Sequence, residues 1–140
     1  MTTIRFRRMT DNDDDGPKYL SLPRDTPRIY NPEAFFRPES HIAICEGEID
    51  AMTAWQAGIP AVGIAGVSGW QKVFAKCFQG HDKVFILADS DDKGQGMKFS
   101  NEVAEQVRNS LVVPMPEGHD VNSFVLENGP LALRERLSLE

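Results

Sequence analysis

Acidic residues directly follow an apolar run near the middle of the chain. Residues 84–88 are apolar, and Asp89, Asp91 and Asp92 come next, with Gly94 after them. In an extended backbone, side chains two residues apart project to the same side, so Asp89 and Asp91 should point together. Two adjacent carboxylates repel each other unless a cation or a proton lies between them. This stretch alone leaves two interpretations open, a divalent-metal site and a solvated acidic loop.

A second acidic group, Glu46, Glu48 and Asp50, follows the apolar run 42–45. Ligands of open parallel sheets bind beyond the carboxyl ends of the strands, so both acidic groups would share one edge if their strands are neighbours. Magnesium binds few carboxylates and keeps waters or substrate phosphates in its other positions. The pattern favours phosphoryl or nucleotidyl transfer. Alternatively, Glu48 and Asp50 could complement the dipole of a helix that starts here.

Other metal sites find no support in the sequence. Cys45 and Cys77 lie within apolar segments without a CxxC or Cys/His grouping, so we expect two buried reduced thiols and no zinc. Residues 11–16 match the opening of a calcium-binding loop, but Leu22 occupies the position of its bidentate glutamate. We interpret that segment as a solvated turn.

The composition limits the class of protein. A chain of 140 residues fits one domain, and its apolar runs are too short to span a bilayer, so we expect a soluble, cytoplasmic protein with no membrane contact. The formal net charge is -6, whereas free-standing nucleic-acid binders usually carry a basic excess. Any work on nucleic acid would therefore need positive charge from metal ions or from another polypeptide.

Strands and helices alternate from residue 41 onward, which predicts an α/β fold with about four mostly parallel strands and helices on both faces. The predicted strands are 42–45, 61–65, 83–88 and 111–113. Apolar residues at helical spacing predict three helices, whose inward faces carry Ile49, Met52, Trp55 and Ile59, then Trp70, Val73, Phe74, Cys77 and Phe78, then Phe99, Val103, Ala104 and Val107.

The two ends of the chain differ from this pattern. Residues 4–8 and 18–22 predict a short hairpin, and four prolines follow it, so we interpret 1–40 as an appendage or linker and 41–140 as the domain. At the other end, Asp120 is the predicted N-cap of a short helix that breaks before a second one at Pro130.

Two of these motifs resemble a known family. Residues 46–50, Glu-Gly-Glu-Ile-Asp, look like the EGxxD motif of TOPRIM domains, which have a Rossmann-like fold. Residues 89–94, Asp-Ser-Asp-Asp-Lys-Gly, look like their DxDxxG motif. Each motif comes at the end of a predicted strand, in the family's order. The chain is therefore similar to TOPRIM proteins.

The flanking residues narrow the resemblance to DnaG-type and phage primases. Residues 116–123 look like the PxGxDPxxL stretch that follows the sheet in these enzymes, with Val121 replacing the usual proline. Residues 17–23 and 27–31 are similar to the segment that leads into TOPRIM in phage and plasmid primases.

The resemblance implies an active site that depends on Mg²⁺ or Mn²⁺. Glu46 would act on proton transfer or metal positioning, and Asp89 and Asp91 would bind the metal. Asp50 would support the first motif, and Asp120 could add a carboxylate from the tail. Asp92 would lie beside the metal site, and Gly94 would form the turn into the next helix.

The implied function is that of the catalytic TOPRIM domain or subunit of a DNA primase, a nucleotidyltransferase that makes RNA primers in DNA replication. Its substrates would be a DNA template and nucleoside triphosphates. Primases of this type also carry a zinc ribbon and a basic subdomain, often with a helicase, and the sequence shows none of these. We therefore expect a separate basic, zinc-ribbon or helicase partner. The alternatives are a TOPRIM-type metal-dependent nuclease and a non-catalytic module that binds nucleic acid or protein.

Overall fold

The computed structural model describes residues 4–9, 16, 19–90 and 94–139. The predicted calcium-loop-like turn at 11–16 lies almost wholly outside these residues, as do Asp91 and Asp92. Within the described residues, no helix is long and apolar enough to cross a membrane.

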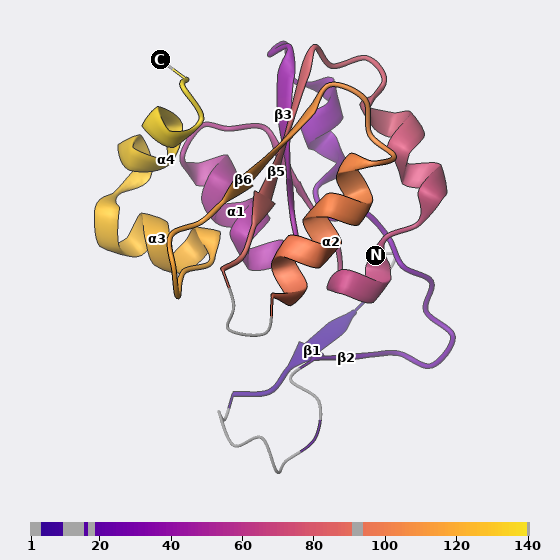
Figure 1. The fold of residues 1–140 in the computed structure, drawn as a ribbon. Helices are drawn as coiled ribbons and strands as arrows, with labels where there is room; N and C mark the ends of the chain where they lie inside the picture. The colour runs from indigo at the N-terminus through magenta and orange to yellow at the C-terminus, as the bar shows by residue number, and fades with distance from the viewer. Residues whose placement is uncertain (1–3, 10–15, 17–18, 91–93, 140) are drawn as a thin grey trace.

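A four-stranded parallel sheet forms the centre of the fold, as the sequence predicted (Figure 1). Its strands stand in the order β4-β3-β5-β6, which places the first and third predicted strands side by side. The strands are β3 (His41–Cys45), β4 (Ala61–Gly63), β5 (Lys83–Ala88) and β6 (Ser110–Pro114). Every residue of β3 except His41 is buried, because helices cover both faces of a parallel sheet.

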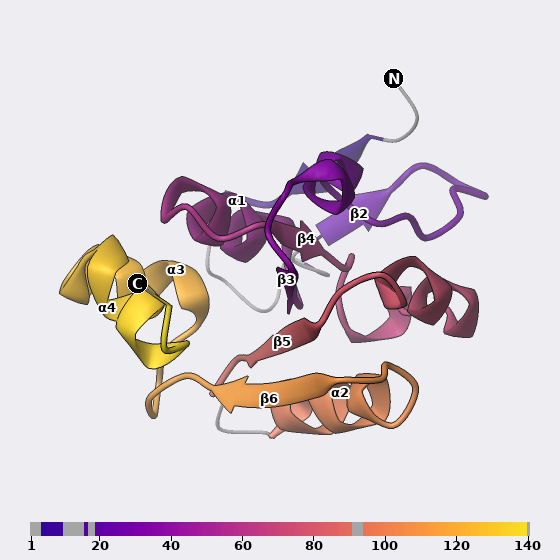
Figure 2. The ribbon, with the colours of Figure 1, turned by 90° about the horizontal axis from the view of Figure 1, so that it is seen from above.

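Alternate strand residues build two hydrophobic clusters, one on each face of the sheet. Ala43 and Leu87 belong to one cluster, and Ile44 and Ile86 belong to the other. The first face is covered by three helices and the second by one helix together with short 3-10 segments. The helices are α1 (Glu48–Gln56), α3 (Val121–Asn128) and α4 (Pro130–Arg136) on the first face, and α2 (Gln95–Ala104) on the second. Figure 2 shows α3 and α4 on one side of β5 and β6, and α2 on the other side.

Helix α1 packs through its alanines and not through Met52, whereas Ile59, which was also expected to point inward, is fully buried. Ala51 and Ala54 are fully buried, whereas Met52, expected to point inward, is 44% exposed. Small side chains let the helix lie close to the sheet, so alanines replace the larger apolar residues at the contact. Trp55 is partly buried against the cluster of the opposite face. Phe99 and Val103 of α2 are buried as expected.

The segment predicted as a second α-helix is the 3-10 helix η4 (Lys72–Phe78). Only Phe78 of its apolar residues is buried, and Val73 and Cys77 are exposed, so the predicted burial of Cys77 is wrong. A 3-10 helix has three residues per turn, and apolar residues spaced by three and four therefore do not stay on one face. Cys45, in contrast, is buried as expected.

The N-terminal segment forms the predicted hairpin and then packs onto the sheet. Strands β1 (Arg5–Arg7) and β2 (Tyr19–Ser21) pair antiparallel as a separate small sheet. Farther along, Tyr30 exchanges backbone hydrogen bonds with Gly63 of β4. The 3-10 helix η2 (Pro32–Phe36) buries Ala34 in the core. The predicted domain boundary at residue 40 stays a prediction, and residues 30–36 cover the outer edge of β4.

Candidate active site

Adjacent strands bring the two acidic groups to one edge of the sheet. Cys45, the last residue of β3, pairs with Leu87 of β5, so Glu46 and Asp89 leave the sheet at nearly the same level. Oε2 of Glu46 and Oδ1 of Asp89 are both shielded from solvent. Two carboxylates in a partly buried setting favour a bound cation, because their repulsion is strong where water is scarce.

The pKa of the Cys45 thiol is affected by the negative charges at this edge. Burial raises the pKa of Cys45 well above its ordinary value, and the carboxylates of Asp50 and Asp89 raise it further. Both carboxylates therefore lie near the end of β3, one from helix α1 and one from the end of β5. The structure thus gathers Glu46, Asp50 and Asp89 around the carboxyl end of β3.

Helix α2 begins very close to Asp89. A Cβ atom at Gly96 would lie 2.5 Å from the backbone oxygen of Asp89, so no larger residue fits without movement of the backbone. Gly94, with a φ of 66°, makes the left-handed turn that starts the helix. Gly94 and Gly96 therefore let the start of α2 lie against the end of β5.

Asp50 joins α1 to α3. Its side chain is only 7% exposed, and its Oδ1 accepts a hydrogen bond of 3.0 Å from the backbone N–H of Asn122. The Thr53 hydroxyl lies 3.0 Å from Asn122 Oδ1 on the same helix pair. Burial raises the pKa of Asp50 to about 6, the charge of Asp120 adds to this rise, and the Asn122 hydrogen bond opposes it. Asp50 therefore links the segment 46–50 to the start of helix α3.

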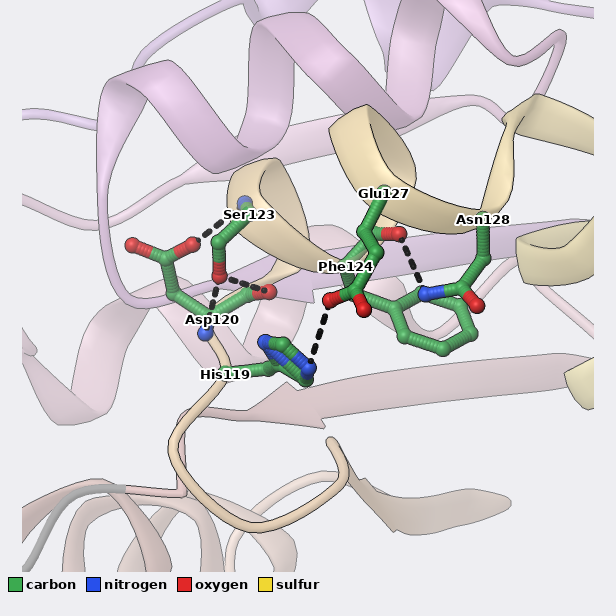
Figure 3. A network of polar contacts seen from close by, with 6 residues as sticks. All are labelled: His119, Asp120, Ser123, Phe124, Glu127 and Asn128. Carbon is green, nitrogen blue, oxygen red and sulfur yellow. Dashed lines mark hydrogen bonds and ion pairs between the residues drawn. The ribbon is translucent and has the colours of Figure 1, made fainter.

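Asp120 caps helix α3, as predicted (Figure 3). The Ser123 N–H donates to Asp120 Oδ1 at 2.6 Å, and the Asp120 N–H donates to the Ser123 hydroxyl at 3.0 Å. The preceding His119 accepts a backbone hydrogen bond from Ser90, and its ring pairs with Glu127 at 3.1 Å. This network ties the loop after β5 to the start of α3.

The N-terminal hairpin contributes residues to the site that the sequence interpretation missed. Arg5 forms an ion pair with Glu48 in the first turn of α1, and its guanidinium lies 4.8 Å from the centre of the Tyr19 ring. Arg7 lies over the same ring at 5.7 Å. A pocket of about 450 Å³ opens beside this contact, with Arg5, Glu48, Tyr30 and Asn31 in its lining. The alternation of Arg5 and Arg7 was the only sequence signal for this cationic hairpin face.

Two carboxylates at this edge have the chemistry of ligands for a divalent cation. Among the described residues, which do not include Asp91 and Asp92, no group of three or more His, Cys, Asp or Glu is arranged to hold a metal ion. Glu46 and Asp89 offer shielded carboxylate oxygens, which suit Mg²⁺ or Mn²⁺ and not a thiol-rich zinc site. The donor set therefore fits a hard divalent cation.

The chain is similar to a known protein family and to proteins of phage and bacterial origin. A family model described as Toprim-like matches residues 43–125. The gene 57 protein of Mycobacterium phage D29 is 47% identical over 137 residues, which cover 98% of this chain and 87% of that protein. A DNA primase of Listeria monocytogenes is 28% identical over 135 residues, covering 87% of this chain and 21% of the primase.

Solved primase structures share the fold. The DnaG catalytic core matches with a TM-score of 0.76 at 22% identity, over 97% of this chain and 47% of that chain. A DNA primase domain from Pseudomonas aeruginosa matches with a TM-score of 0.72 at 22% identity, over 97% and 46%. The chain therefore spans just under half of these cores.

Proposed function

Because the chain belongs to the Toprim-like family, we propose that it provides the metal-dependent nucleotidyl-transfer site of a DNA primase. The observation that carries the proposal is the pair of carboxylates, Glu46 and Asp89, at the ends of two adjacent parallel strands within the family domain. The similarity to a DNA primase supports the reaction class.

We propose the following roles for the acidic residues. Glu46 and Asp89 would hold the metal with Asp91. Glu46 would also take the proton from the primer 3′ hydroxyl as that hydroxyl attacks the α-phosphate of the nucleoside triphosphate, and pyrophosphate would leave. Magnesium or manganese would neutralise the charge that develops on the reacting phosphate. Asp50 positions the Glu46 loop through its bond to Asn122. Any contribution from Asp120 would come mainly from Oδ2, because Oδ1 caps α3.

The substrates we propose are a DNA template and ribonucleoside triphosphates, and the role would be in replication in the cytoplasm of the host cell. Solved primase relatives include a DnaG catalytic domain bound to ssDNA. The charge of -6 makes a basic partner polypeptide, with or without a helicase, part of the proposal. The primase cores extend well beyond the region that this chain matches.

Ribonucleotide incorporation on single-stranded DNA tests the function, with the chain assayed alone and together with the products of neighbouring reading frames. Asp89→Asn and Glu46→Gln should each lower incorporation by about 100-fold or more, because each removes a carboxylate that would hold the cation at the reacting phosphate. Glu102→Gln, on the exposed surface of α2, is the matched control and should keep full activity.

Two results would contradict the proposal. Undiminished incorporation by Asp89→Asn would show that the acidic edge is not the site of nucleotidyl transfer. Metal-dependent cleavage of DNA or RNA without any incorporation would favour the nuclease alternative.

A further inference from the structure

A second, positively charged groove lies far from the acidic edge. It has a volume of about 840 Å³ and runs between η4 and the C-terminal end of α2, with Lys72, Lys76 and Arg108 in its lining. Helix α2 begins beside Asp89 and runs ten residues toward this groove, about 15 Å along its axis (Figure 1). The groove is therefore separate from the candidate active site.

The charge of the groove is opposite to that of the whole chain. Lys72, Lys76 and Arg108 are exposed, and among the described residues none of them forms an ion pair. Glu105 is the one acid among the described residues of the lining, so these three cations and one anion give a net charge of +2. The chain as a whole carries -6. The cations thus remain available for an external anion.

Helix dipoles explain only part of this arrangement. Arg108 follows the C-terminal end of α2, and Lys76 lies in the last turn of η4, where cations are favourable. Lys72 begins η4, where a cation faces the positive end of the dipole. The side chains of Gln79 and Asn109 add neutral hydrogen-bond donors to the lining. Lys72 at the N-terminal end of η4, together with these two amide side chains, could bind an anionic ligand.

We propose that this groove binds the phosphate backbone of single-stranded nucleic acid. The ligand class rests on the proposed function, because a template strand must be held near a site whose own carboxylates repel phosphate. The cations and amides contact phosphates without reading bases, so binding would be independent of sequence. The length of α2 corresponds to four or five nucleotides of a strand that is stacked as in a duplex, at about 3.4 Å each. A strand anchored here can therefore reach the acidic edge.

Fluorescence anisotropy with a labelled oligothymidylate of about 12 nucleotides tests the proposal without nucleotides or divalent metal. For three phosphate contacts, the slope of log affinity against log salt should be about -2. Lys72→Gln, Lys76→Gln and Arg108→Gln should each make that slope shallower by about 0.7 and weaken binding about fivefold at low salt. Lys98→Gln, an exposed residue on α2 outside the groove, is the matched control.

The assay distinguishes this proposal from failure of the proposed function. Loss of primer synthesis in Asp89→Asn with normal oligonucleotide binding would support both. Normal binding by all three groove variants, or absence of binding by the unmodified chain at low salt, would overturn the groove proposal and leave the catalytic one standing. Equal binding of an oligoglutamate of the same charge would show a general anion site and also overturn it.

Discussion

Asp50 combines deep burial with a carboxylate in the first turn of α1. Its pKa is about 6 in the folded chain, against an ordinary value of 3.8, so the folded chain holds a proton between these values that the unfolded chain releases. The contribution of Asp50 to stability is therefore most favourable below about pH 4, falls as pH rises to about 6, and is constant above that. The cause is chiefly the burial of the charged form.

Asp50→Asn should therefore stabilise the protein at neutral pH. The amide keeps an acceptor for the Asn122 N–H and avoids a buried charge, and the gain should be on the order of 1–3 kcal/mol at pH 7, disappearing near pH 4. Urea unfolding at several pH values measures it, with exposed Asp82→Asn as control. A difference between Asp50→Asn and the unmodified chain that did not change with pH would contradict the prediction.

The two thiols should react very differently. Cys77 is exposed on η4, whereas Cys45 is buried and its pKa is raised by burial and by Asp50 and Asp89, so little thiolate forms there. A colorimetric thiol reagent should modify one cysteine rapidly in the native protein and the second only after unfolding. Cys77→Ser should abolish the rapid phase. Rapid modification of Cys45 in the native protein would show that the end of β3 opens readily.

At the scale of elements, the contact between α2 and β5 depends on Gly96. Alanine in an exposed helix usually stabilises by up to about 1 kcal/mol relative to glycine, but a Cβ at this position would lie 2.5 Å from the Asp89 backbone oxygen. Gly96→Ala should therefore destabilise by roughly 1–3 kcal/mol and lower activity, because it shifts Asp89. Thermal unfolding and ribonucleotide incorporation measure the two effects.

Gly80→Ala is the matched control for this change. Nothing lies within 4 Å of a Cβ at Gly80, so the substitution should leave both the unfolding temperature and the activity nearly unchanged. A stable, fully active Gly96→Ala variant would mean that α2 can move away from Asp89 at little cost.

The elements differ in how well the sequence predicts them. The strands β3 and β5 were predictable because continuous apolar runs are typical of strands buried on both faces. The capped start of α3 was predictable because Asp120 uses local chemistry. The buried faces of α1 and η4 could not be predicted in this way. The close packing of the alanines of α1 and the 3-10 geometry of η4 both depend on neighbouring elements. For the same reason, the contact of the hairpin with Glu48 was invisible in the sequence.

At the scale of the whole molecule, charge is distributed unevenly. The net charge is -6, and Glu46, Asp50 and Asp89 gather at one edge, whereas Lys72, Lys76 and Arg108 surround the distant groove. Arg5 of the hairpin pairs with Glu48 in the first turn of α1, next to that edge. The carboxylates at the acidic edge therefore repel one another. Monovalent salt should weaken this repulsion by screening, and a divalent cation should weaken it by binding to the carboxylates.

Salt and magnesium should therefore stabilise the chain by separable amounts. Raising monovalent salt from about 0.01 M to about 0.1 M shortens the Debye length from about 30 Å to about 10 Å, which should raise the free energy of unfolding. Magnesium at equal ionic strength should add about 1.4 kcal/mol at ten times its dissociation constant. Asp89→Asn should lose the magnesium increment and keep the monovalent one. An identical response of both proteins to magnesium would mean that the cation acts by screening alone, which would remove the acidic edge as a binding site.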